Sequence, residues 1–324
     1  MTSVLAVESL TVAIDGRKGT SIAVADVSLE IGRGEILGVV GESGAGKSMT
    51  GTAILGLLEP PLRLASGRIF LDGQRIDDLP EAEMRRLRGR AIGAVFQDPL
   101  TSLNPVMTIG RQLTQTIRTH MEMSEADARA RALGLLQEVG IPAARERLDA
   151  YPHQLSGGMR QRVVLALAFA CDPRLVIADE PTTALDVSVQ AQVIELIKRL
   201  CREHGTAVML VTHDMGVIAQ TADRIAVMYA GRQVETGPAR TVLKSPRHPY
   251  TRGLVAAIPS MRRRREWLAQ IDGAMPRPGA LPEGCAFHPR CPDRIDTCSA
   301  RRPELTTAGL HRTACWLDQG SATP

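Results

Sequence analysis

The chain has 324 residues, of which 44% are hydrophobic, and its 39 basic and 35 acidic side chains leave a formal net charge of +4. This length and apolar content can bury a substantial core and fit one large domain with an appendage. The small net charge and the 3% aromatic content give no sign of a nucleic-acid-binding surface.

The N-terminus lacks a charged segment followed by an apolar one, as a signal peptide would have. No uninterrupted apolar stretch approaches the roughly 18 to 20 residues that a membrane-spanning helix needs. We therefore expect a cytosolic chain that does not itself cross a membrane.

The first 60 residues predict a small β layer and then a nucleotide-binding unit. Residues 4–12 and 22–31 alternate apolar and polar side chains, as antiparallel strands do. Residues 35–40 form a short apolar strand that leads into a glycine-rich turn, and residues 47–58 have the pattern of a helix. This order of strand, loop and helix is typical of an α/β fold.

The glycine-rich turn matches the phosphate-binding pattern G-x-x-x-x-G-K-[ST]. Its residues are Gly41, Glu42, Ser43, Gly44, Ala45, Gly46, Lys47 and Ser48. The glycines allow backbone amides to approach a triphosphate, whose charge is also stabilised by the positive end of the following helix. We expect Lys47 to reach the β- and γ-phosphates and the Ser48 hydroxyl to bind Mg²⁺.

From about residue 100 to residue 151 the pattern is helical, with Ser124 as a predicted N-cap, so a helical insertion of the α/β domain is expected. Residues 175–178 and 207–211 are predicted as short buried strands. The amphipathic helix between them ends at Gly205.

Two acidic residues, Asp179 and Glu180, follow the strand at 175–178 directly. A carboxylate at the end of a buried strand beside a phosphate loop can orient Mg²⁺, and the next one can polarise an attacking water. We therefore assign Asp179 to the metal and Glu180 as the general base.

Proline and glycine become frequent after residue 259, which predicts a linker at about 260–282 and a small loop-rich module after it. The module contains four cysteines with the spacing C-x5-C-x6-C-x16-C. They are Cys285, Cys291, Cys298 and Cys315. Four thiolates suit an iron-sulfur cluster or a tetrahedral Zn²⁺, although the paired C-x2-C of structural zinc sites is missing. Free thiols or opportunistic disulfides are the remaining alternative.

A known family is indicated by the segment 155–162, Leu-Ser-Gly-Gly-Met-Arg-Gln-Arg, which closely resembles the signature motif of the ABC ATPases. Three further segments are similar to family elements. Gln97 resembles the Q-loop glutamine, residues 184–186 resemble the D-loop, and His213 resembles the switch histidine. The resemblance covers residues 4 to about 240 and implies a P-loop ABC ATPase fold. That fold has an antiparallel β layer, a RecA-like α/β core and a helical subdomain at about 100–160.

The resemblance also implies a role for each matching residue. In the family the signature caps the γ-phosphate of ATP held by the partner's phosphate loop, so two subunits close head to tail around ATP. Gln97 senses Mg²⁺ or the attacking water, and His213 contacts the γ-phosphate and acts with Glu180. The expected ATP-binding residues also include Met49, and the expected Mg²⁺ ligands are Ser48, Gln97 and Asp179. The signature residues are Ser156, Gly157, Gly158 and Met159, and the D-loop residue is Asp186.

One position departs from the family pattern. The family commonly stacks adenine on an aromatic residue of the early β layer, where this chain has Ile14. Stacking on an aromatic side chain typically contributes about 1 to 3 kcal/mol of binding free energy per base. We therefore expect weaker adenine stacking and lower nucleotide selectivity.

Two segments, residues 97–105 and 248–254, resemble the ATPase subunits of dipeptide and oligopeptide importers, and nickel importers share part of this pattern. Peptide-importer ATPases carry a similar tail, in which four cysteines can hold a [4Fe-4S] cluster. The resemblance therefore favours that cluster over Zn²⁺. It also implies an ATPase domain at 1–259 and an importer-type extension at 260–324.

The expected function is an Mg-ATP-driven motor that powers peptide import at the cytoplasmic face of the inner membrane. Its expected partners are two transmembrane permease subunits and a second ABC ATPase, which is a copy or a relative of this chain. A periplasmic or extracellular substrate-binding protein acts indirectly, and no nucleic acid is expected. The alternatives are a motor for nickel or another small solute, an exporter motor, and a soluble ABC ATPase of translation or DNA repair.

Overall fold

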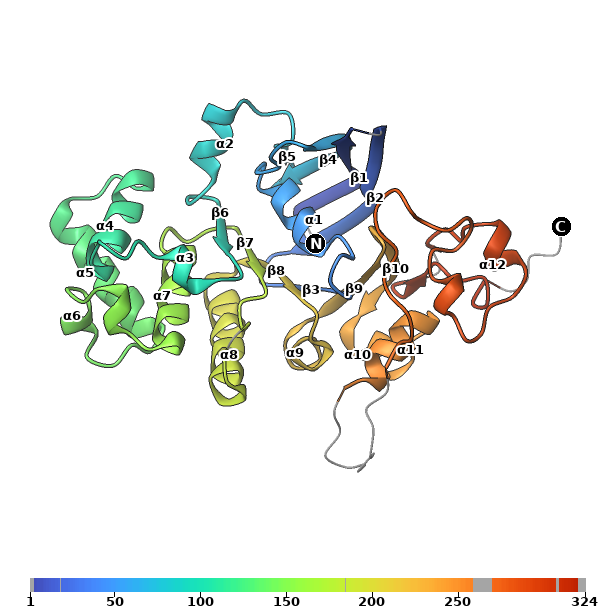
Figure 1. The fold of residues 1–324 in the computed structure, drawn as a ribbon. Helices are drawn as coiled ribbons and strands as arrows, with labels where there is room; N and C mark the ends of the chain where they lie inside the picture. The colour runs from blue at the N-terminus through green and yellow to red at the C-terminus, as the bar shows by residue number, and fades with distance from the viewer. Residues whose placement is uncertain (1–2, 18, 184, 259–269, 307–308, 320–324) are drawn as a thin grey trace. The chain divides into compact units, whose positions relative to one another are not determined.

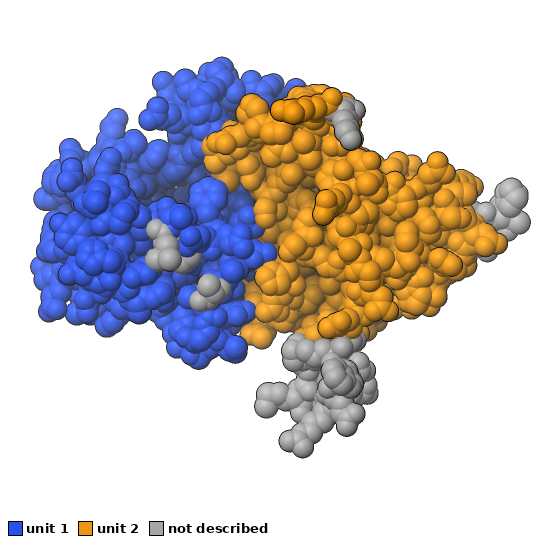
Figure 2. Space-filling view, viewed as in Figure 1, with its two compact units in different colours: residues 1–5, 31–36, 71–210 blue, residues 6–30, 37–70, 211–324 orange. Residues whose placement is uncertain are grey.

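The computed structural model describes residues 3–17, 19–183, 185–258, 270–306 and 309–319. The chain divides into two compact units, coloured separately in Figure 2. The helical unit contains residues 1–5, 31–36 and 71–210, and the phosphate-loop unit contains residues 6–30, 37–70 and 211–324. The predicted domain boundary after residue 259 lies outside the described residues.

The helical unit contains buried strands. Strand β6 (Ile92–Val95) pairs in parallel with β7 (Leu175–Asp179), and β8 (Ala207–Thr212) follows β7 in hydrogen-bonded order. Every residue of β8 is buried, as are residues 175–178 of β7. Such continuous apolar strands are typical of a parallel sheet covered on both faces. The strands predicted at 175–178 and 207–211 are confirmed.

Helices occupy the region where the sequence predicts a helical insertion. Helix α4 (Ile109–His120) begins after Thr108, and α5 (Glu125–Glu138) begins after Ser124, whose Oγ accepts the Asp127 N–H at 3.1 Å. A cap of this kind contributes about 1 kcal/mol. The other elements of this unit are β5 (Gln74–Arg75), α2 (Glu81–Leu87), α3 (Pro99–Ser102), α6 (Ala144–Arg147), the 3-10 helix η1 (Pro152–Gln154), α7 (Gly157–Phe169) and α8 (Val187–His204), which ends at Gly205 as predicted (Figure 1).

The phosphate-loop unit is built on strands from both ends of the chain. Strand β3 (Ile36–Val40) pairs in parallel with β9 (Arg224–Tyr229), which pairs antiparallel with β10 (Arg232–Pro238). Strand β11 (Arg312–Thr313) adds to β10 in antiparallel register. In the second sheet β1 (Ser3–Gly16) lies between β2 (Gly19–Gly32) and β4 (Leu62–Leu71), so the strands predicted at 4–12 and 22–31 are confirmed. The helices are α1 (Lys47–Ile54), α9 (Met215–Thr221), α10 (Ala239–Lys244), α11 (Pro249–Ala256), η2 (His288–Arg290) and α12 (Thr297–Ala300).

Helix α1 is shorter than the pattern predicts, because it ends at Ile54 instead of continuing to residue 58. Gly56 lies just beyond its end with φ of 63° and donates its N–H to the Ala53 carbonyl. A glycine in this left-handed conformation stops a helix at little cost, whereas other residues adopt it reluctantly. The apolar leucines after Ile54 therefore belong to a loop.

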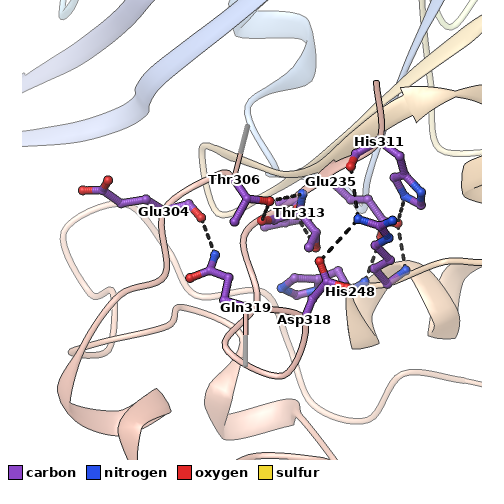
Figure 3. Close-up of polar contacts among 10 residues, drawn as sticks. Glu235, His248, Glu304, Thr306, His311, Thr313, Asp318 and Gln319 are labelled. Carbon is purple, nitrogen blue, oxygen red and sulfur yellow. Dashed lines mark hydrogen bonds and ion pairs between the residues drawn. The ribbon is translucent and has the colours of Figure 1, made fainter. Parts of the chain in front are cut away.

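A buried carboxylate attaches the C-terminal segment to β10. Glu235 is fully buried and accepts the backbone N–H groups of Arg247 at 2.8 Å and His248 at 3.0 Å. Nε2 of His311 lies 2.6 Å from its Oε1, and Figure 3 shows these groups converging. A carboxylate at such a position is stable only when it is paired. His311, directly before β11, is thus part of the attachment of β11 to β10.

Among the described residues, no helix combines the length and the apolar content that crossing a bilayer requires.

Candidate functional site

The phosphate loop joins β3 to α1 inside the phosphate-loop unit, as predicted. Gly41 has φ of 153°, and a Cβ at this position would lie 2.2 Å from the Met228 carbonyl oxygen of β9. Gly46, with φ of 97°, is the N-cap of α1. Only glycine fits the first position, and both glycines let the backbone turn so that amide groups at the start of α1 can face an anion.

Lys47 is buried, and its ammonium group binds the loop itself. Nζ donates to the carbonyl oxygens of Gly41 at 2.8 Å and Glu42 at 3.0 Å. A triphosphate would offer this ammonium stronger, charge-assisted acceptors in exchange. Ser43, Gly44 and Ser48 are exposed, whereas Ala45 is buried and its carbonyl accepts the Gly231 N–H at 2.9 Å.

The acidic strand end lies in the helical unit. Asp179 is the last residue of β7, and Glu180 follows with φ of 47°. This left-handed conformation is uncommon for a residue with a side chain and costs of order 1–3 kcal/mol, which is typical of functional sites. Glu180 Oε2 accepts Nε2–H of Gln97 at 3.2 Å and the Thr183 hydroxyl at 2.9 Å. The structure therefore brings together two predicted site residues, Gln97 and Glu180, which are 83 positions apart.

The signature and D-loop residues begin helices of the same unit. Ser156 is the N-cap of α7 and accepts the Met159 N–H at 3.3 Å, with Gly157 as the first helical residue. Asp186 is the N-cap of α8 and accepts the Val189 N–H at 2.9 Å. The hydrogen bond from Val189, followed by that from the Ser188 hydroxyl, lowers the pKa of Asp186. Both residues thus have a local structural role, whichever further role the family assigns to them.

His213 is exposed and lies between β8 and α9 in the phosphate-loop unit. The next residue, Asp214, is the N-cap of α9 and accepts the Gly216 N–H at 2.7 Å. Its backbone N–H in turn donates to the Thr212 hydroxyl at 3.0 Å. These bonds fix the backbone on both sides of His213 and leave its imidazole accessible.

The residues assigned to Mg²⁺ have suitable chemistry. Ser48 supplies a hydroxyl in the first turn of α1, and Asp179 supplies a carboxylate at the end of β7. Gln97 adds an amide oxygen, while its amide nitrogen is directed to Glu180. Mg²⁺ takes oxygen ligands of these kinds and keeps several waters. Ile14, the residue at the position where the family commonly stacks adenine, is half-buried in β1.

The four cysteines of the C-terminal module lie near one another. Burial, followed by the neighbouring thiols of Cys298, Cys315 and Cys291, raises the pKa of Cys285 to about 11. Burial also raises the pKa values of Cys291 and Cys315. Among the described residues, however, no group of three or more His, Cys, Asp or Glu side chains is arranged to hold a metal ion. The donor chemistry suits a metal or a cluster, but the structure does not show a formed site.

The sequence analysis missed the role of the segment 248–254, which it used only as a subfamily marker. Burial, followed by the charge of Arg252, lowers the pKa of His248 to about 3, so the imidazole is neutral. Its Nδ1 accepts the Tyr250 N–H at 3.0 Å and caps α11. Tyr250 is fully buried, and its hydroxyl accepts the Glu42 N–H at 2.8 Å. Pro249 at the first position of α11 is a helix-start signal that could have indicated the cap, whereas the contact with the loop has no local signal.

Comparison with known proteins finds two family profiles in the chain. One, described as "ABC transporter", matches residues 24–183, and the other, "Oligopeptide/dipeptide transporter, C-terminal region", matches residues 234–298. The dipeptide transport ATP-binding protein DppD of Bacillus subtilis is 45% identical over 99% of this chain and 97% of its own length. DppD of Escherichia coli is 45% identical over 94% of this chain and 93% of its own length.

Solved structures agree with these sequence relatives. The ATP-binding cassette MJ0796, seen as a dimer in a post-hydrolysis state bound to ADP and Pi, superposes with a TM-score of 0.65 at 30% identity. The match covers 73% of this chain and 99% of that one. CbiO1 of Clostridium perfringens, part of the ABC transporter complex cbiONQ, matches with the same TM-score at 28% identity over 76% of this chain and 92% of its own.

Proposed function

The chain belongs to the ABC transporter ATP-binding proteins that carry the oligopeptide/dipeptide transporter C-terminal region, and from this premise we propose that it powers the import of dipeptides or oligopeptides. As a member of this family it is an ATPase coupled to transport and uses ATP with Mg²⁺. The observation that carries the proposal is the 45% identity to a dipeptide transport ATP-binding protein over 99% of the chain, which takes in the C-terminal module. A soluble ABC ATPase of translation or DNA repair has no reason to carry that module.

In the proposed ATP site the phosphate loop, residues 41–48, binds the triphosphate with Met49 beside it. Lys47 exchanges its contacts with the Gly41 and Glu42 carbonyls for phosphate oxygens. Ser48, Asp179 and Gln97 would hold Mg²⁺, which would neutralise charge on the triphosphate. Each of these side chains offers an oxygen ligand.

Glu180 acts as the general base in this proposal. The Gln97 amide and the Thr183 hydroxyl both donate to Oε2, so they orient the carboxylate that would polarise the attacking water. His213 contacts the γ-phosphate. Ser156, Gly157, Gly158 and Met159 cap the γ-phosphate bound by a second ATPase subunit, and Asp186 lies at that same interface. The exposed N-terminus of α7 supports this role, since its amide groups attract an anion.

The proposed assembly places this chain at the cytoplasmic face of the inner membrane, bound to two transmembrane permease subunits. The second ATPase is a related chain or a copy of this one, and a periplasmic or extracellular binding protein delivers the substrate. The proposal of these partners is supported by the relatives, which are peptide transport ATP-binding proteins.

The substrate class is tested by uptake into vesicles that contain this chain, its permease subunits and its second ATPase, with the binding protein outside. With ATP enclosed, we expect labelled dipeptides to accumulate and nickel not to. Vesicles without ATP are the control. Nickel accumulation without peptide accumulation would assign the chain to the nickel alternative instead.

We also propose that Cys285, Cys291, Cys298 and Cys315 bind a [4Fe-4S] cluster, with Zn²⁺ as the alternative. The support is the set of four thiols in one small module, where Cys298 and Cys315 are close enough to contribute to the raised pKa values of Cys285 and Cys291. Full-length protein purified without oxygen should be brown and contain iron and sulfide, and Cys291→Ser should lose both. Cys171→Ala, which changes a buried cysteine outside the module, should keep them. Colourless protein with zinc would favour the alternative, and metal-free protein with reactive thiols would exclude both.

A further inference from the structure

One residue of the phosphate loop, Glu42, is held at each of its three polar groups. Its backbone N–H donates to the Tyr250 hydroxyl at 2.8 Å, and its carbonyl accepts from Lys47 Nζ at 3.0 Å. Its carboxylate accepts hydrogen bonds from both terminal nitrogens of Arg290, with Nη1 at 2.9 Å from Oε2 and Nη2 at 3.0 Å from Oε1. The first and third contacts come from distant segments of the same compact unit. The loop is therefore attached to the C-terminal module through a bidentate ion pair.

Contacts other than the one with Glu42 also hold the Arg290 side chain in place. Its side chain is only 7% exposed, and it lies in the 3-10 helix η2 directly before Cys291. Nε donates to the Asp272 carbonyl at 2.7 Å, and Nη2 also donates to the Ile271 carbonyl at 3.1 Å. With two of its five N–H donors satisfied in this way, the guanidinium presents a preformed planar fork to the carboxylate.

An aromatic cluster connects the same parts of the unit. Tyr229 of β9 and Tyr250 of α11 meet with ring centroids 4.7 Å apart. Phe287 of the C-terminal module packs against both, at 5.2 Å and 5.4 Å. The Arg290 guanidinium lies over the Tyr229 and Phe287 rings, at 5.8 Å and 6.0 Å from their centroids. Tyr250 and Arg290, which both contact Glu42, therefore pack against the same two rings, those of Tyr229 and Phe287.

We propose that Arg290 is a positioning residue for nucleotide binding, acting through Glu42. A negative charge on a phosphate-binding loop disfavours the binding of a triphosphate. Glu42, the second residue of the loop, carries such a charge. Arg290 neutralises that charge in a partly desolvated setting and holds the carboxylate on the C-terminal module. The inference rests on the proposed function, because it takes residues 41–48 as the ATP site. It gives the module a defined effect on the ATPase that does not depend on whether its cysteines bind a metal.

The test measures ATP affinity and turnover in the full chain. In Arg290→Ala, the carboxylate is unpaired, and we expect the Kd for ATP to rise about tenfold, the size of effect that one charge contact has on binding. The kcat at saturating ATP should change less than about threefold, because Arg290 does not touch the reacting atoms. Adding Glu42→Gln to Arg290→Ala should restore most of the lost affinity, since the unpaired charge is then gone.

The control is Arg252→Ala, which removes an exposed ion pair between α11 and the module, Arg252 to Asp293 at 2.7 Å, and should leave the Kd unchanged. If Arg290→Ala does not fold, Glu42→Gln alone remains decisive, because it leaves Arg290 unopposed and should bind ATP more tightly than the unmodified chain. An unchanged Kd in Arg290→Ala would overturn the proposal. So would a double variant as weak as Arg290→Ala, since that would show a purely structural role.

Failure of the proposed function gives a different result. If Lys47→Ala binds ATP as well as the unmodified chain, residues 41–48 are not the ATP site. If Lys47→Ala loses ATP but Arg290→Ala keeps it, only the role of Arg290 is wrong.

Discussion

Replacing Glu180 by Gln is expected to lower the rate of ATP hydrolysis by a factor of about 10²–10⁴, the usual contribution of a general base, while ATP binding is retained. The amide has nearly the same shape as the carboxylate but cannot take a proton from water. Gln97 and Thr183 still find an oxygen acceptor in the variant, so the local structure should persist. Phosphate release measures turnover, and a filter-binding assay measures the Kd for ATP.

The matched control is Glu195→Gln, an exposed glutamate of α8 that pairs with Lys198 at 2.8 Å. It changes the same functional group away from the site and should leave turnover unaltered. Because ATP is bound but not consumed in Glu180→Gln, this variant should also accumulate as the ATP-bound dimer, which light scattering detects. Turnover within about threefold of the unmodified chain would remove Glu180 from the role of base.

Replacing Lys47 by Ala is expected to raise the Kd for ATP about a hundredfold. Hydrogen bonds from a charged group contribute about 1.5–3 kcal/mol each, and 1.4 kcal/mol corresponds to a factor of ten, so losing contacts to two phosphates gives at least this size of effect. Turnover should be lost with binding. The measurement is titration with a fluorescent ATP analogue, accompanied by thermal unfolding.

Lys198→Ala, on the exposed face of α8, is the control for Lys47→Ala and should bind ATP normally. The unfolding curve matters because Lys47 also satisfies two loop carbonyls in the structure. A folded Lys47→Ala chain that binds ATP with unchanged affinity would contradict the assignment of the phosphate loop.

The sequence predicted those parts of the site whose geometry depends on residues close together in the chain. The spacing of glycines, Lys47 and Ser48 identified a loop whose geometry depends on a few consecutive backbone angles. The structure adds the reason for the first glycine, because a Cβ on Gly41 would lie 2.2 Å from the Met228 carbonyl oxygen, so a side chain cannot fit there. The N-cap at Ser124 and the helix end at Gly205 were predicted for the same local reason.

The contacts that the sequence did not predict join residues far apart in the chain. Tyr250 and Arg290 lie 208 and 248 positions from Glu42, and no periodicity or spacing relates them. The same holds for the pairing of Glu235 with His311. Short strands such as β6 and β11 were also missed, since two to four residues are too few to show an alternating pattern. Helix α1 was predicted too long because the apolar run after Ile54 resembles helix, although Gly56 ends it.

The central claim is that ATP turnover by this chain drives peptide uptake. The most direct measurement is the accumulation of a labelled dipeptide in vesicles containing the assembled transporter with ATP enclosed, recorded together with phosphate release. We expect both signals with the unmodified chain, and neither above background when the same complex contains Glu180→Gln. Peptide accumulation that is equal in the two complexes, or phosphate release that proceeds without any peptide entering, would contradict the account.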